Sequence, residues 1–191
     1  FETYCNYCLM MRYFALFLFT CFYCMAHVKA QPFDFRHYQV EDGLSNNTVI
    51  TALQDRYGFI WLGTSEGLNR FDGNSFKVYR QQANNPHSLK SNSVYCLYED
   101  RKGHLWVGTE KGIAAYDSDL DQFHHPILME DGPVRSICED TEGLLWFIFR
   151  DELYYYDPLA KKTFKKYIPG VLQVSVITRD PKGGIWAGSV E

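Results

Sequence analysis

The sequence lacks several features that would place it in a large functional class. Its 191 residues contain no His-Glu-x-x-His motif and no phosphate loop of the Gly-x-x-x-x-Gly-Lys type. No run of Lys or Arg is longer than two residues, and the formal net charge is −4. A nucleic-acid surface needs a basic face to contact phosphates. We therefore expect no nucleic-acid contact, no cofactor and no catalytic residues, and we predict a binding domain rather than an enzyme.

Cysteine is scarce beyond the first 24 residues. Four of the six cysteines lie in the N-terminal segment as two Cys-x-x-Cys pairs: Cys5, Cys8, Cys21 and Cys24. We expect that segment to be a removable leader, which is no place for a metal or redox site. Only Cys96 and Cys138 remain, both on expected inner strands. We predict two free, buried thiols, with a disulfide between them as the alternative.

Long apolar runs are confined to residues 13–26. Arg12 precedes this run and Val28-Lys29-Ala30 follows it, which is the order of a secretory signal peptide. The run covers 14 residues, whereas ~20 are needed to span a bilayer. We predict a leader over residues 1–30 that starts at Met10 or Met11 and is cleaved before Gln31; a buried core segment is the alternative. Residues 31–191 would then form one exported domain.

A blade-length repeat runs through residues 49–191. Its frame is a Trp that recurs after 45, 40 and 40 residues, with an Asp six positions and a Gly three positions before each Trp. The four units are Asp55, Gly58 and Trp61; Asp100, Gly103 and Trp106; Asp140, Gly143 and Trp146; and Asp180, Gly183 and Trp186. Asp-x-x-Gly is typical of a tight turn, because Asp binds nearby backbone amides and Gly takes a positive φ. We assign these residues to the structural frame of the repeat.

The segments around each turn predict four short strands per unit. The runs on either side of Asp-x-x-Gly favour an antiparallel pair, and an aromatic-Asp pair eleven residues after each of the first three Trp predicts a second turn. Four strands in about 40–45 residues are the unit of a propeller blade, whereas a β-solenoid, the alternative, has shorter coils. Phe35-Arg-His-Tyr38 repeats the spacing of the fourth strands. We therefore predict an all-β fold: a partial β-propeller of about three and a half four-stranded blades, truncated at the C-terminus, with an N-terminal closing strand over residues 33–39.

The repeat also resembles a known family. Leu-Ser-Asn at 44–46, Ile-Trp-Leu-Gly-Thr at 60–64 and Gly-Leu-Asn-Arg-Phe-Asp at 67–72 resemble the two-component regulator propeller repeat, and the second unit echoes them at 105–109 and 112–117. The third unit departs, with Ile148 and Glu152 in place of Gly. The resemblance implies the periplasmic sensor region of a hybrid two-component histidine kinase anchored in the inner membrane. The implied partners are an oligosaccharide signal, the remaining blades and the membrane-kinase portion; a homodimer is left open.

Departures from the repeat mark candidate ligand contacts. The connection 81–92 is longer than its equivalents, and we expect it to open on the same ring face as loops 64–66, 109–111 and 149–151. A tolerated surface insertion is the alternative. The predicted ligand-binding residues on this face are Glu66, Asn84, Asn85, His87, Lys90, Glu110, Lys111 and Arg150.

Two motifs resemble metal sites, but we predict that neither binds a metal. Asp117-Ser-Asp-Leu-Asp121 begins like a calcium loop but lacks its Gly and bidentate Glu, so we predict a solvated turn. His124 and His125 are adjacent on an expected strand and should face opposite ways, so no metal site is predicted.

Three functional classes remain after this survey. The first is a sensor that binds a ligand and passes the signal to further domains. The second is a fragment of a propeller enzyme, a lyase or a hydrolase, and the third is a non-catalytic protein-interaction propeller. A fold by itself does not choose between them.

The first prediction concerns export. Because the run 13–26 and the small residues before Gln31 have the order of a signal peptide, the mature exported protein should begin at or near Gln31. Mass spectrometry of the exported protein measures this directly. A cytoplasmic product that retains Met11 would contradict the prediction.

Overall fold

The computed structural model describes residues 11, 13, 16–19 and 35–189. The chain divides into two units, Phe1–His37 and Tyr38–Glu191. In the first unit, residues 11, 13 and 16–19 are helical and exposed. None of the helices in the described part of the chain has the length and apolar character needed to cross a bilayer. The predicted cleavage site and Met10 lie outside the described residues.

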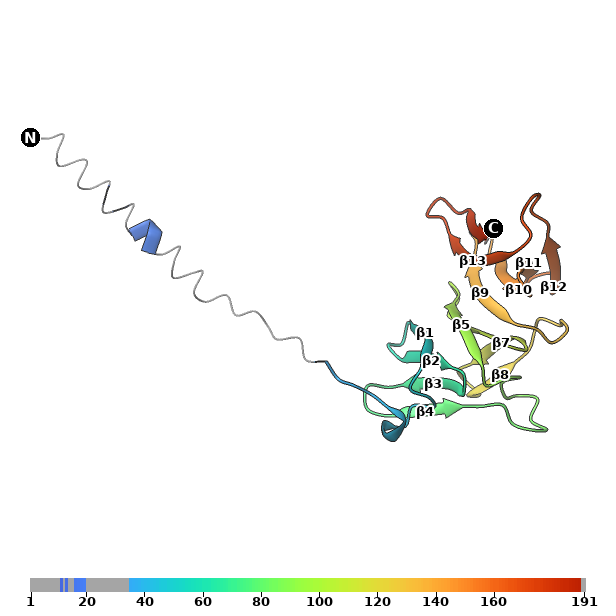
Figure 1. The fold of residues 1–191 in the computed structure, drawn as a ribbon, viewed down its shortest axis with the longest axis horizontal. Coiled ribbons are helices and arrows are strands. Elements are labelled where there is room, and N and C mark those ends of the chain that lie inside the picture. Colours follow the sequence, from blue (N-terminus) through green and yellow to red (C-terminus); the bar gives the residue numbers. More distant parts are fainter. Residues whose placement is uncertain (1–10, 12, 14–15, 20–34, 190–191) are drawn as a thin grey trace, which may run out of the picture. The chain divides into compact units, whose positions relative to one another are not determined.

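The second unit consists of antiparallel sheets that follow one another along the chain (Figure 1). A short 3-10 helix, Val40–Asp42, precedes them. The first sheet contains β1 (Val49–Gln54), β2 (Ile60–Thr64), β3 (Gly67–Phe71) and β4 (Phe76–Tyr79), and the second contains β5 (Val94–Glu99), β6 (Leu105–Thr109), β7 (Gly112–Asp117) and β8 (Gln122–His124). The third contains β9 (Val134–Glu139), β10 (Leu145–Phe149), β11 (Glu152–Asp157) and β12 (Lys162–Lys166), and the last is the pair β13 (Val174–Arg179) and β14 (Ile185–Ser189).

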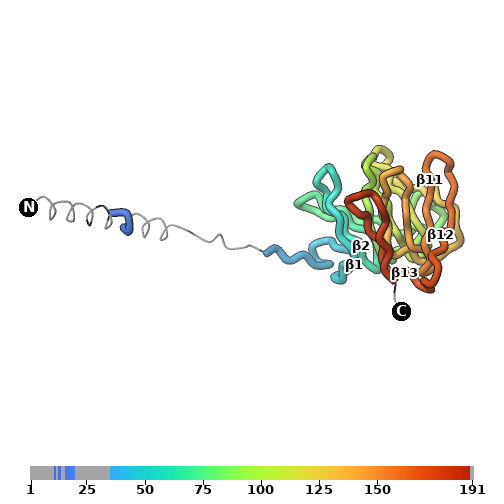
Figure 2. The backbone as a smooth tube through the Cα atoms, turned by 90° about the horizontal axis from the view of Figure 1, so that it is seen from above, coloured from blue at the N-terminus to red at the C-terminus, as the bar shows by residue number. Residues whose placement is uncertain are grey.

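These sheets are the blades of a partial propeller. In each complete sheet the strands pair in chain order, so that every neighbour is joined by a short hairpin. The first strands of successive blades contact one another, β1 with β5, β5 with β9 and β9 with β13. They lie along the inner side of the arc in Figure 1, and Figure 2 shows the sheets side by side from above. The predicted fold class is therefore confirmed: the domain is all-β and is built of four-stranded blades.

A β-bulge recurs at the same place in every blade. The register between the first and second strands shifts directly after the repeated Val, at Val49, Val94, Val134 and Val174. One residue is thereby left out of each ladder: Ile50, Tyr95, Arg135 and Ser175. A bulge bends and twists its strand, so its recurrence gives the inner strands a common shape.

The hydrophobic core lies between blades rather than inside one. Trp61 of the first blade packs in a cluster with Leu105, Val107 and Tyr116 of the second. Trp106 packs in the same way with residues of the third blade, including Phe147. Trp61 is 1% exposed and Trp106 6%, whereas Trp186 in the last two-stranded sheet is 65% exposed. Trp61 and Trp106 therefore each pack against the next blade, and the predicted core role is confirmed for these two residues.

Two sequence-based interpretations need correction. Residues 35–39, the described part of the predicted closing strand, form no strand. A strand needs a sheet edge for its backbone hydrogen bonds, and Tyr38 packs instead on the rings of Phe71 and Phe76, 4.9 and 5.5 Å away. The predicted solvated turn is confirmed for residues 118–120, which are exposed. Asp121 at its end is only partly solvated: it accepts hydrogen bonds from Lys77 of β4 and from two tyrosine hydroxyls, so it joins two blades.

The two remaining cysteines are free thiols, as predicted. Cys96 lies in β5 and Cys138 in β9. Burial raises the pKa of each thiol to about 12. A thiol with so high a pKa carries almost no reactive thiolate at neutral pH, so both residues act as small apolar groups of the core.

The second prediction follows from the inter-blade core. Truncating a buried aromatic side chain typically costs about 3–5 kcal/mol. Trp61→Ala and Trp106→Ala should each lower the free energy of unfolding by a similar amount, because both fill equivalent inter-blade clusters. Chemical denaturation of the full chain measures the loss. A variant with wild-type stability would contradict this core role.

Candidate functional site

One face of the propeller carries the Asp-x-x-Gly turns between first and second strands, and we call it the turn face. In the first turn, Asp55 Oδ1 accepts the backbone N–H groups of Tyr57 and Phe59, at 2.9 and 3.0 Å. The other carboxylate oxygen accepts the indole N–H of Trp61 at 2.7 Å. Gly58 has a φ of 89°, which is the left-handed region that the turn requires. One carboxylate thus closes the turn and orients the Trp.

The same hydrogen bonds recur in the next two blades. Trp106 donates to Asp100 at 3.0 Å and Trp146 donates to Asp140 at 2.7 Å. In both turns the Oδ1 atom of the Asp accepts two backbone N–H groups as well. A residue that performs one structural task in three blades is an unsuitable candidate for a unique active site.

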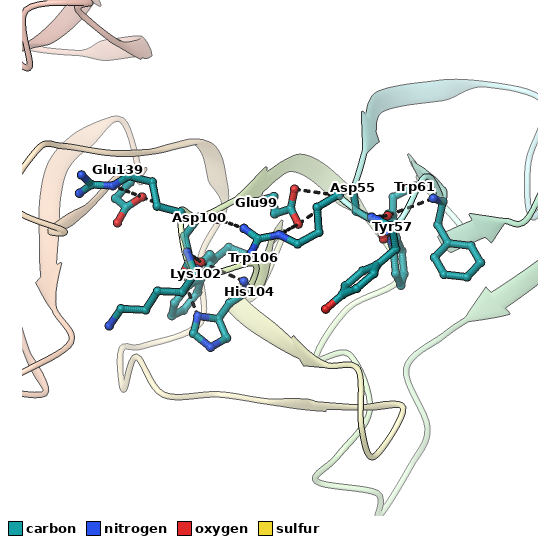
Figure 3. A network of polar contacts seen from close by, with 12 residues as sticks. Asp55, Tyr57, Trp61, Glu99, Asp100, Lys102, His104, Trp106 and Glu139 are labelled. Atoms are coloured by element: carbon teal, nitrogen blue, oxygen red, sulfur yellow. Dashed lines mark hydrogen bonds and ion pairs between the residues drawn. The ribbon is translucent and has the colours of Figure 1, made fainter.

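The turns of neighbouring blades are also linked to each other, as Figure 3 shows. Arg56 contacts Glu99 of the next blade, Nε to Oε1 at 2.9 Å, and its Nη2 donates to the Asp100 carbonyl at 3.0 Å. Arg101 repeats this arrangement with Glu139, Nε to Oε2 at 3.2 Å. We call these the Arg-Glu links. Glu139 is only 6% exposed, so its charge depends on Arg101 for compensation.

The Arg-Glu link does not continue to the last sheet. Thr141 stands at the position of Arg56 and Arg101, and Arg179 stands at the position of the glutamates. Gly183 allows the turns to approach closely here, since a Cβ on it would lie 2.5 Å from the Thr141 methyl group. These links were not predicted from the sequence, although Asp-Arg at 55–56 and 100–101 and Glu-Asp at 99–100 and 139–140 are their signal.

The opposite face, which we call the loop face, brings together the connections that were predicted to converge. Ser93, directly after the long connection, contacts the carbonyl of Ser65, and its own carbonyl accepts the N–H of Glu110 at 3.0 Å. Arg80 donates to the carbonyl of Glu66 at 2.9 Å. The blade-to-blade connections and the loops between second and third strands therefore lie on one face.

A cavity of about 340 Å³ opens on the loop face. The long connection supplies most of its wall, and Lys111, His125 and Asp131 supply the rest. The lining residues are Gln81, Gln82, Asn85, Pro86, Ser88, Leu89, Lys90, Lys111, His125 and Asp131. Of the eight predicted ligand-binding residues, three line this cavity: Asn85, Lys90 and Lys111.

The other five predicted residues lie outside it. Asn84 has a φ of 66° in the long connection, and His87 lines a second cavity, of about 230 Å³, beside β4. Glu66 and Glu110 are exposed in hairpin loops. Arg150 contacts Glu130 at 3.2 Å and donates to the carbonyl of Asp131 at 2.6 Å, so it anchors a connection. These five residues are not brought to one place.

The two adjacent histidines diverge, as predicted. The ring of His125 lies 3.0 Å from the carbonyl of Ser88, Nε2 to O, in the wall of the loop-face cavity. Burial lowers its pKa, which favours the neutral imidazole. His124 instead lines a cavity between the second and third blades. His125 was missed as a candidate for the loop-face cavity because the fold, not the spacing, brings it beside Ser88.

Residues 63–67, Gly-Thr-Ser-Glu-Gly, match the Gly-x-Ser-x-Gly pattern of serine hydrolases. In those enzymes the motif turns from a strand into a helix. Here it joins β2 to β3 in a hairpin, and the Thr64 hydroxyl donates to the carbonyl of Gly67 at 3.0 Å. Ser65 is exposed in that loop and contacts no described histidine. The motif therefore belongs to the blade repeat and not to a nucleophile site.

Two stretches of the repeat match a known family model. Residues 43–66 and 88–111 each match the family model described as "Two component regulator propeller". Over 73 residues the chain is 41% identical to the histidine kinase P4 of Formosa agariphila, an alignment that covers 38% of this chain and 5% of that protein. The chain therefore spans about a twentieth of that relative.

Solved structures share the fold. The extracellular domain assigned to the hybrid two component system BT4673 of B. thetaiotaomicron superimposes with a TM-score of 0.66 and 22% identity, covering 80% of this chain and 22% of that one. Virginiamycin B lyase from Staphylococcus aureus gives a TM-score of 0.60 at 16% identity, covering 74% of this chain and 49% of that one. At these identities the likeness concerns the fold alone.

The third prediction concerns the Arg-Glu links. Arg101→Gln should lower the free energy of unfolding, because it leaves the buried carboxylate of Glu139 without its cation. The double variant with Glu139→Gln should lose less than the sum of the single variants. Denaturation of all four proteins measures this coupling, and Lys102→Gln, on the neighbouring exposed residue, is the matched control. Strictly additive losses would show that the link contributes nothing.

Proposed function

We propose that this chain, whose blades are two-component regulator propeller repeats, is the ligand-sensing propeller of a hybrid two-component signalling protein and that its ligand is an oligosaccharide. The match of two repeats to the family model supports the sensor role. The 41% identity to part of a histidine kinase supports a kinase in the same polypeptide. The remaining blades and the membrane-kinase portion would be its partners within that protein.

The observation that carries the proposal is the cavity on the loop face. It lies where the long connection between the first and second blades departs from the repeat. Its wall presents side-chain amides from Gln82 and Asn85, and Lys90 and Lys111 add ammonium groups. Amides donate and accept hydrogen bonds and ammonium groups donate them, which suits a ligand rich in hydroxyl groups. A sensor needs such a site on a rigid scaffold with variable loops.

The site would work outside the cytoplasm. The predicted leader over residues 1–30 supports export, and the similar BT4673 domain is extracellular. In a cell with two membranes, the propeller would then lie in the periplasm, with the full-length protein anchored in the inner membrane.

The enzyme alternative has less support. It depends on the fold that the chain shares with virginiamycin B lyase at 16% identity, and a fold by itself does not define an activity. The Gly-x-Ser-x-Gly match, residues 63–67, lies in a hairpin. A non-catalytic propeller that contacts a protein partner shares the fold but would not need the polar cavity.

The fourth prediction tests the loop-face cavity. Isothermal titration of the full chain against a panel of oligosaccharides should identify a ligand. Lys111→Ala and Asn85→Ala should then weaken binding by about tenfold or more, because each removes hydrogen bonds from the wall. Lys182→Ala, an exposed lysine of the turn face, is the control and should leave the affinity unchanged.

Two results would overturn the proposal. One is the absence of binding across a panel that covers the common polysaccharide backbones. The other is an oligosaccharide that binds with equal affinity to the wild type and to both cavity variants, since its site would then lie elsewhere.

A further inference from the structure

The cavity lined by His124 has a volume of about 700 Å³ and lies on the turn face between the second and third blades. The aromatic residues Trp106 and Tyr156 form part of its wall, and Ala115, His124 and Pro126 of the second blade also line it. It does not share a residue with the loop-face cavity. An inference drawn from it is therefore independent of the proposed function.

The equivalent space between the first and second blades is filled. Arg70 pairs with Trp61 across β2 and β3, and its guanidinium carbon lies 5.8 Å from the Trp61 ring centroid and 4.8 Å from that of Phe59. Its Nη1 donates to the Tyr116 hydroxyl at 2.8 Å. Tyr79 completes the filling, with its ring stacked 5.7 Å from that of Trp61.

Both of these side chains are missing between the second and third blades. Ala115 pairs with Trp106 in the register where Arg70 pairs with Trp61. Tyr79 stands two residues after Lys77 in the first blade. The equivalent position in the second blade, two residues after His124, is occupied by Pro126. In the third blade the same register position is occupied by Tyr155, whose ring lies 5.0 Å from that of Trp146. Of the three complete blades, only the second has a small residue at this position.

The groups that Arg70 uses in the first interface are still present in the second. Trp106 replaces Trp61 as the aromatic wall, and Tyr156 replaces Tyr116 as the hydroxyl acceptor. The Tyr156 hydroxyl makes no hydrogen bond to a described residue, and the described residues include no fully buried side-chain polar atom without a partner. The hydroxyl is therefore accessible, and Tyr156 lines the cavity. Tyr116, in contrast, is bonded to Arg70 and Asp121.

The charge of the wall favours a cation. The lining residues include four carboxylates, from Asp100, Glu139, Glu142 and Asp157, but only two permanent cations, from Arg101 and Lys102. Arg101 and Glu139 compensate each other, which leaves three carboxylates against the single cation of Lys102. A planar cation can stack on the indole and donate hydrogen bonds from its edge, whereas an ammonium group of similar charge cannot do both in the same geometry.

We propose that the cavity between the second and third blades binds a guanidinium group supplied from outside the blades, stacked on Trp106 and bonded to the Tyr156 hydroxyl as Arg70 is to Trp61 and Tyr116. The group would come from a small guanidino compound or from an arginine side chain of a peptide. The absence of an arginine at position 115 makes the site available to it.

The test is a titration of the full ¹⁵N-labelled chain with methylguanidinium, followed at the indole N–H of Trp106. This N–H is bonded to Asp100 and can be assigned with Trp106→Phe. We expect a saturable shift of the Trp106 signal and none with methylammonium at equal concentration. Tyr156→Phe should weaken binding about tenfold, because it removes the acceptor.

Three variants provide the matched controls. Ala115→Arg supplies the guanidinium from the strand itself and should abolish the Trp106 shift, and Ala115→Leu, which fills the space without a charge, should do the same. Arg70→Ala opens the equivalent space in the first interface and should create a second site, seen as a new saturable shift of the Trp61 indole.

The source of the group is distinguished by a third titration. An arginine-containing tripeptide that binds more tightly than methylguanidinium indicates a peptide ligand, whereas equal or weaker binding indicates a small compound. The proposal is overturned if methylguanidinium and methylammonium give the same response, or if Ala115→Arg and Ala115→Leu leave the Trp106 shift unchanged.

Discussion

The carboxylate of the repeated Asp is the group on which the rest of the propeller depends. It accepts two backbone N–H groups with one oxygen and the indole N–H of the Trp with the other, for example at Asp55. The same carboxylate therefore closes the hairpin and orients the Trp. Because the Trp packs on the next blade, a local turn also determines how two blades meet. The Arg-Glu links join the same turns across the blade boundary.

The two faces of the propeller differ in what their residues do. On the turn face, acids and bases are largely engaged in structural contacts, and the repeated residues occupy nearly the same environment in each blade. On the loop face the connections differ in length, and the longest of them forms a cavity with polar walls. A rigid frame with variable loops allows the ligand site to change without loss of the fold. The exception on the turn face is the cavity between the second and third blades, where Ala115 and Pro126 stand at the positions that Arg70 and Tyr79 occupy in the first blade.

The polar network between the first and second blades shows how a non-repeated residue can become structural. Asp121 lies in the turn after β7, where the sequence indicates only a solvated loop. Burial disfavours its ionised form, but hydrogen bonds from Lys77, Tyr116 and Tyr79 outweigh this and lower the pKa of Asp121 to about 2. These partners come from two blades and from separate strands. No pattern of neighbouring residues in the sequence predicts such a cluster, because its members come together only when the blades pack.

The amino-acid sequence by itself determined the strands, the turns and the blade repeat of this protein. These depend on contacts between residues close in the chain, such as the six-residue separation of Asp100 and Trp106, and four repetitions make the pattern unmistakable. Only the tertiary structure decided which residues share a cavity, that His124 and His125 serve different cavities, and that residues 35–39 form no strand. The reason is physical: these properties depend on which blade or sheet edge lies alongside, and the neighbours across a blade boundary are about 40 residues apart in the chain.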